Sequence, residues 1–167
     1  VGRQPYQTNC SARDSFVMSL FTFGEGYHNY HHEFQHDYRN GVKPWNFDPT
    51  KWAIWLLEKA GMAGDLRRVP KSKILLAEMT AARINAEKEL ERVAQSSDVV
   101  WREKATGALH RLLDRLGEVR EELEDAISSK VHLSRFCMER RRQILLSVLD
   151  DLAEIRNLRL PTCSTSS

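Results

Sequence analysis

Cysteine is scarce in this chain. The three residues Cys10, Cys137 and Cys163 are odd in number and far apart, and no Cys-x-x-Cys pair is present. A disulfide framework needs an even set of cysteines at close spacing, so the sequence argues against one. This cysteine usage suits a protein that stays in a reducing compartment.

Long apolar runs and an excess of one charge are also missing. The longest apolar stretch, near residues 16–23, is too short to span a bilayer. Lysine and arginine number 25 against 23 aspartates and glutamates, and the balance holds both before and after residue 70. Because nucleic-acid binding relies on a basic surface, that class of function has little support.

Aromatic residues and proline become rare in the second part of the sequence. Twelve of the fourteen Phe, Trp and Tyr residues precede residue 56, and four of the five prolines lie at or before Pro70. The remainder is charged and poor in glycine, which is typical of helices. We expect an all-α protein with one part over 1–70, a helical extension over 71–160 and a disordered tail over 161–167.

Capping signals predict two helices in the first part. Ser11 or Asp14 can cap a helix that runs on into a cluster of histidines. Asp48 precedes Pro49, and proline is favoured at the first position of a helix. Gly61 marks the end of this second helix.

The second of these helices is amphipathic. Trp52, Trp55, Leu56 and Lys59 follow helical spacing, so tryptophans occupy one flank. Such a helix lies either at a membrane interface or on a protein core. The pattern alone does not separate these two alternatives.

Four of the six histidines lie in residues 24–41. On a helix, His28, His31 and His32 share one face because they are three and four residues apart. Neutral imidazole is a common ligand of iron and zinc, so the spacing favours a metal site over a polar surface cluster. Glu25, one turn earlier, can accept a hydrogen bond from the second nitrogen of a ligand ring.

The remaining histidines are not predicted to bind metal. His36 follows the cluster by four residues and falls off the shared face. His110 and His132 are isolated in charged segments that we expect to be helical, where solvated side chains are the rule. The metal hypothesis therefore depends on three histidines.

Several separate motifs occur in a fixed order: GEGYHNYHH (24–32), DYR (37–39), FDPTKW (47–52) and GMAGDLRRVPKSKI (61–74). Over roughly residues 2–75 they resemble the end of the catalytic region of membrane-bound fatty acyl desaturases, above all the stearoyl-CoA (delta-9) type. The first motif matches the third histidine box of that family. Gln35 replaces the family's usual proline, and Pro44-Trp45 alters the run before FDPTKW, so both changes bear on the loop that leaves the box.

The resemblance implies that His28, His31 and His32 are iron ligands, shared between the two irons of a di-iron centre. The parent enzyme would use O2 to insert a cis double bond, by default delta-9, into a saturated fatty acyl group on CoA or another carrier. A C–H bond in the middle of such an acyl group is neither acidic nor polarised, so the reaction needs a metal cofactor rather than an amino-acid side chain. The aromatic residues that flank the box are interpreted as packing residues rather than tunnel walls: Tyr27, Tyr30 and Phe34.

The resemblance also shows what lies outside this sequence. The family carries two earlier histidine boxes and about four membrane-spanning helices, and three histidines cannot complete two iron sites. We therefore expect a C-terminal fragment of an integral membrane enzyme, with this segment on the cytosolic side and inactive alone. No haem-binding HPGG motif is present, so electrons are expected from a separate donor such as cytochrome b5 or ferredoxin.

The extension shows coiled-coil spacing. One apolar seam repeats at three- and four-residue intervals: Ala105, Leu109, Leu112, Leu116, Val119, Leu123 and Ala126. A second apolar set follows three arginines: Leu145, Val148, Leu149, Leu152 and Ile155. With a break at Ser96-Ser97-Asp98, these segments predict a long helical hairpin or self-association. The alternative function is a soluble helical interaction module with a structural or incidental metal site.

Overall fold

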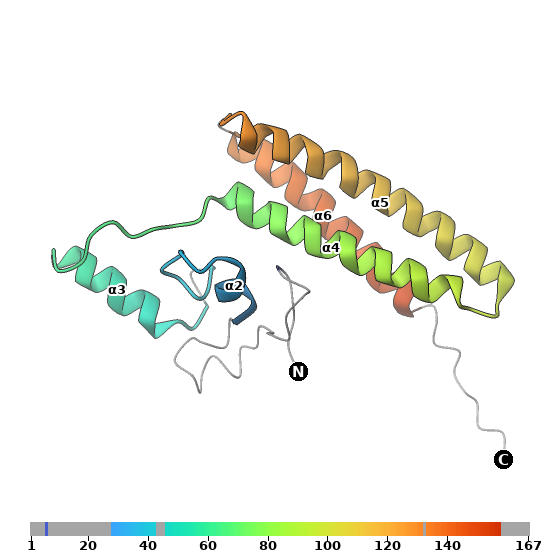
Figure 1. Cartoon of the computed structure of the whole chain (residues 1–167), viewed down its shortest axis with the longest axis horizontal. Coiled ribbons are helices and arrows are strands. Elements are labelled where there is room, and N and C mark those ends of the chain that lie inside the picture. The colour runs from blue at the N-terminus through green and yellow to red at the C-terminus, as the bar shows by residue number, and fades with distance from the viewer. Residues whose placement is uncertain (1–5, 7–27, 43–45, 132, 158–167) are drawn as a thin grey trace, which may run out of the picture. The chain divides into compact units, whose positions relative to one another are not determined.

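A computed structural model describes Tyr6 and residues 28–42, 46–131 and 133–157 of this protein (Figure 1). The elements over those ranges are helices: α2 (His28–Glu33), α3 (Pro49–Lys59), α4 (Lys71–Ala94), α5 (Val99–Ser128) and α6 (Arg135–Asn157). No strand occurs in the described ranges, so the predicted all-α class is confirmed. None of the described helices has the length and apolar character needed to cross a membrane.

Two compact units divide the protein, one over residues 1–81 and the other over residues 82–167. The first unit holds α2, α3 and the start of α4, and the second holds the rest of α4 with α5 and α6. The division into units falls inside α4, and α4 begins at Lys71. The boundary near residue 70, which rests on sequence likeness and composition, stays a prediction.

Helix α3 forms where the capping signals predicted it. The Asp48 side chain accepts a hydrogen bond from the Lys51 backbone N–H at 2.9 Å, and Pro49 is the first helical residue. The helix ends at Lys59. Gly61 follows with a φ of +72°, in the left-handed region that commonly terminates helices and that glycine adopts without strain.

Helices α5 and α6 pack side by side and run antiparallel (Figure 1). Arg141 Nη2, near the start of α6, lies 3.0 Å from Glu122 Oε2, near the end of α5. Within the same unit, Glu89 Oε2 near the end of α4 lies 3.3 Å from Arg156 Nε near the end of α6, so this ion pair joins the ends of these two helices. The predicted hairpin is confirmed, and Asp98 caps α5 after the predicted break.

Apolar seams are buried along both helices of the hairpin. The α5 seam is buried at six predicted positions: Ala105, Leu109, Leu112, Leu116, Val119 and Leu123. The α6 seam is buried at four: Leu145, Val148, Leu152 and Ile155. Leu149 is 41% exposed, which corrects its assignment to the seam. It lies one residue beyond Val148, about 100° around the helix, and so projects away from the buried stripe.

Helix α4 carries a seam that the sequence analysis missed. Its buried side chains include six at alternating four- and three-residue intervals: Leu75, Met79, Ala82, Ala86, Glu89 and Val93. Two alanines and a glutamate weaken the apolar signal of this pattern. Glu89 is 2% exposed and takes a position that an apolar residue fills in most seams.

Candidate metal-binding site

Helix α2 places residues 28–32, the last five of the histidine box, in helical geometry, as the spacing predicted. His28, His31 and His32 therefore occupy backbone positions on one face. The His31 and His32 side chains are exposed, and their ring centroids lie 6.3 Å apart at an angle of 64°. The His28 side chain and Glu25 lie outside the described residues.

The earlier helix predicted from the caps Ser11 and Asp14 lies outside the described residues, apart from α2 itself. The remaining histidines are placed only in part. His36 and His110 are exposed, as predicted for residues that do not join the box, whereas His132 lies outside the described part of the sequence.

The face of α2 opposite the exposed imidazoles is buried. Asn29 is 0% exposed and Tyr30 1% exposed. The Tyr30 ring packs against Tyr6 and Phe34, with centroids 5.2 Å and 5.0 Å away, and Asn29 Oδ1 accepts a hydrogen bond from the Tyr6 N–H at 3.0 Å. Tyr30 and Phe34 thus pack against other aromatic rings of this unit, and the third flanking aromatic, Tyr27, lies outside the described residues.

Asp37 is the polar centre of the loop that leaves α2. Its side chain is fully buried and accepts hydrogen bonds from Tyr30, Arg39 and Val69. The Tyr30 hydroxyl and the Val69 N–H each lie 2.8 Å from Oδ2. Arg39 contributes its backbone N–H at 3.0 Å and a two-pronged guanidinium contact, Nε to Oδ1 at 2.9 Å and Nη2 to Oδ2 at 2.7 Å. One carboxylate thus joins the box helix, the following loop and the segment before α4.

The charge state of this cluster follows from its hydrogen bonds. Burial by itself would raise the pKa of Asp37, but hydrogen bonds from Arg39, Val69 and Tyr30 outweigh burial and hold that pKa below its usual range. Burial, with the hydrogen bond to Asp37, raises the pKa of Tyr30 well above its usual range. At neutral pH the cluster therefore holds a carboxylate, a guanidinium and a protonated phenol.

A second carboxylate, Asp48, organises the next turn. Its Oδ2 accepts hydrogen bonds from the backbone N–H groups of Asn40 and Gly41 at 2.8 and 3.0 Å, while Oδ1 caps α3. The buried Lys51 ammonium donates a hydrogen bond to the Gly41 carbonyl oxygen at 3.0 Å. Burial lowers the pKa of Lys51. A Cβ on Gly41 would lie 2.5 Å from Asn46 Cβ, so this turn has no room for a side group.

The outer face of α3 is apolar and exposed. Trp52 and Trp55 are each nearly half exposed, and Leu56 is more so. The Lys59 ammonium lies 5.9 Å from the centroid of the Trp55 ring.

The donor chemistry of the box fits iron or zinc, because imidazole is a preferred ligand of both. Within the ranges that the structure describes, no three His, Cys, Asp or Glu side chains gather around one point. Sequence reasoning assigned no role to Asp37 in supporting the box. The Asp-Tyr-Arg sequence could have indicated this role, since a carboxylate and a guanidinium two residues apart can pair within one turn.

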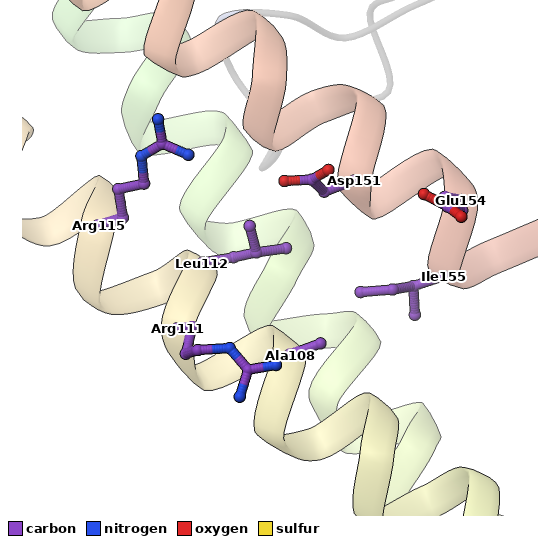
Figure 2. A pocket seen from close by; sticks show the side chains of 7 residues that line it. All are labelled: Ala108, Arg111, Leu112, Arg115, Asp151, Glu154 and Ile155. Carbon is purple, nitrogen blue, oxygen red and sulfur yellow. The ribbon is translucent and has the colours of Figure 1, made fainter.

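The second unit offers a different kind of site. A groove of about 360 Å³ runs between α5 and α6 (Figure 2). Arginines line its α5 side, acids line its α6 side, and small or apolar residues lie between them: Arg111, Arg115, Asp151, Glu154, Ala108, Leu112 and Ile155. No histidine or cysteine lines this groove, so it does not resemble the box.

Relatives named as acyl-CoA desaturases match about half of the sequence. Acyl-CoA desaturase 1 of Saccharomyces cerevisiae is 41% identical over 90 residues, which are 53% of this chain and 18% of that protein. The probable acyl-CoA desaturase of Schizosaccharomyces pombe is 45% identical over 74 residues, 44% of this chain and 15% of the relative. Human stearoyl-CoA desaturase is 39% identical over 74 residues, 44% of this chain and 21% of the relative.

These matches confirm the resemblance that the motifs predicted. The chain spans at most 21% of the length of these three relatives. No family model and no solved structure matches this sequence.

Proposed function

We propose that this protein holds the third histidine box of an acyl-CoA desaturase, an oxidoreductase, and that His28, His31 and His32 bind iron. The observation that carries the proposal is α2: in a sequence whose relatives are named desaturases, the described part of the box is a helix with two exposed imidazoles on it. Its other face is buried and fixed by hydrogen bonds.

When bound, a di-iron centre supplies the activation of O2 that removal of two unactivated hydrogens requires. The three box histidines would hold part of that centre, and histidines outside this sequence would complete it. Glu25 would accept a hydrogen bond from the second nitrogen of a ligand ring and fix its tautomer. The Asp37 and Asp48 turns would keep the loop after the box in one conformation.

The rest of the assignment concerns the full-length protein. Its substrate would be a saturated fatty acyl-CoA or another acyl carrier, with delta-9 as the default position of the new double bond. Electrons would come from a separate donor such as cytochrome b5 or ferredoxin. The parent would be integral to a membrane, with residues 1–70 on the cytosolic side and residues 71–160 as a helical extension able to self-associate.

Single histidine substitutions in the full-length protein test the ligands. His28→Ala, His31→Ala and His32→Ala should each abolish desaturation and lower bound iron, because each removes a ligand. His36→Ala is the matched control: it changes an exposed histidine four residues beyond the box and should keep substantial activity. Fatty-acid products and iron content are measured on each preparation, and unimpaired desaturation by the His32→Ala enzyme would sink the assignment.

A further inference from the structure

We propose that Asp37 is a positioning residue for the metal ligands: it fixes the rotation of helix α2 and thereby the directions of the box imidazoles. The inference rests on the proposed function, because it concerns ligands that the box supplies. Asp37 lies five residues beyond His32 and bonds to the box through Tyr30. It acts through that residue and does not itself contact a metal.

Helix α2 needs an external support. The hydrogen bonds inside a helix fix its coil but not its rotation about its own axis, which depends on the side chains that it buries. In the described part of α2, His28–Glu33, the buried side chains are Asn29 and Tyr30. Contacts from the rest of the first unit to these side chains therefore set the rotation of α2.

Tyr30 connects Asp37 to helix α2, because it lies within the histidine box and its hydroxyl donates to the Asp37 carboxylate. Successive residues on a helix differ in direction by about 100°. Fixing Tyr30 in the buried cluster, with its hydroxyl on Asp37, therefore fixes where His31 and His32 project. A rotation of α2 by one residue would bring an imidazole to the buried side and break the Tyr30–Asp37 hydrogen bond.

Asp37 is itself held by segments on both sides. Arg39 grips both carboxylate oxygens, and the Val69 N–H approaches from 32 residues farther along the sequence. A second link joins the same segments, since the Tyr38 N–H donates to the Arg67 carbonyl oxygen at 3.2 Å. The box helix is thus tied to the residues that enter α4.

A merely structural role and a positioning role predict different results for Tyr30→Phe. This change removes one hydroxyl, keeps the ring in the cluster with Phe34, and leaves Asp37 with its Arg39 and Val69 donors. A structural role predicts a small change in stability alone. A positioning role predicts looser α2 amides and weaker metal binding in a protein that stays folded.

The matched control is Glu89→Gln. Glu89 is also a buried carboxylate, and it bonds to Arg92 and Arg156, but it lies in the second unit. Asp37→Asn and Glu89→Gln remove the same charge and keep the shape of the side chain. If the two variants differ in their effect on α2, the cause is the position of Asp37 beside the box and not the loss of a buried charge in general.

The experiment uses the 167-residue protein with two readouts: hydrogen exchange of the α2 amides without metal, and the affinity for added Co²⁺. Tyr30→Phe and Asp37→Asn should speed α2 exchange and weaken Co²⁺ binding by about tenfold, while Glu89→Gln leaves both unchanged. Unchanged α2 exchange in both first-unit variants, or equal effects of Glu89→Gln, would overturn the proposal.

The two proposals fail in different ways. If a variant with alanine at His28, His31 and His32 binds Co²⁺ as well as the unaltered protein, the ligand assignment is wrong. Hydrogen exchange of α2 still decides whether Asp37 holds the helix. If the triple variant loses Co²⁺ but Asp37→Asn and Tyr30→Phe keep full affinity, the ligands stand and the positioning role is wrong.

Discussion

Two buried carboxylates, Asp37 in the first unit and Glu89 in the second, both pair with arginine but in unlike surroundings. Asp37 also accepts two backbone N–H groups and a tyrosine hydroxyl, and it joins segments up to 32 residues apart. Glu89 lies in a helical seam next to Val93 and receives arginines whose side chains are more than half exposed. The loop that follows the box in the first unit is thus held by polar bonds to a few acids, whereas the α5–α6 hairpin of the second unit is held by apolar seams.

Removal of the Asp37 carboxylate, the polar centre of the first unit, should cause the largest loss of stability. Asp37→Ala leaves the buried ends of Tyr30 and Arg39 without their acceptor, and removing one partner of a buried pair costs roughly 3–5 kcal/mol. Urea unfolding followed by tryptophan fluorescence in a Trp101→Phe background reports the first unit, because Trp101 is the one tryptophan of the second unit. A loss below about 1 kcal/mol would show that the polar bonds do not govern this unit.

Breaking an apolar seam should be nearly as costly, but in the other unit. Leu116→Ala removes a 0% exposed side chain from α5 and should destabilise the second unit by roughly 2–5 kcal/mol. Leu149→Ala is the matched control on α6, since that leucine is exposed, and its effect should stay within about 0.5 kcal/mol. Helicity followed during urea unfolding gives the stability of both variants. Equal losses of stability would mean that the seam is assigned to the wrong residues.

The lowered pKa of Asp37 makes the stability of the first unit sensitive to acid. A carboxyl whose pKa is lower folded than unfolded adds stability above its ordinary pKa of 3.8, and that stability is lost as the pH falls below this value. In Asp37→Asn the first unit should lose this part of its acid dependence. Unfolding midpoints between pH 6 and pH 2 are the measurement, and identical pH profiles for the two proteins would contradict the assignment.

The smallest effect concerns the caps. Asp98 accepts one exposed hydrogen bond, from Trp101 N–H, so Asp98→Ala should cost about 1 kcal/mol in the second unit. Asp48 is buried and accepts three backbone N–H groups across two turns, so Asp48→Ala should cost more in the first. Thermal unfolding measures the loss of stability in both variants. An equal fall in the unfolding temperature would mean that Asp48 acts only as a helix cap.

Local and periodic signals made much of the fold predictable. The cap at Asp48 and the stop at Gly61 depend on bonds within a few residues, and the α5 seam repeats the same apolar pattern over several turns. Leu149 was assigned wrongly because an apolar residue beside a seam looks like part of it. The α4 seam was missed because Ala82, Ala86 and Glu89 carry little hydrophobic signal.

The support of the candidate site was harder to predict. The box histidines are recognised from spacing because they are neighbours on one helix. The Val69–Asp37 hydrogen bond joins residues 32 apart and involves a backbone N–H, which no pattern of side chains reveals. The sequence therefore predicts the candidate ligands, and the structure shows how the helix that carries them is held.

The central claim is that this protein supplies part of an iron shell for a desaturase rather than a whole site. The most direct test measures bound iron and fatty-acid products on one preparation of the 167-residue protein, supplied with O2, a reductase system and stearoyl-CoA. We expect less than one tightly held iron per molecule and no oleoyl product, because three clustered imidazoles leave the shell incomplete. Two irons per molecule together with an oleoyl product would contradict it.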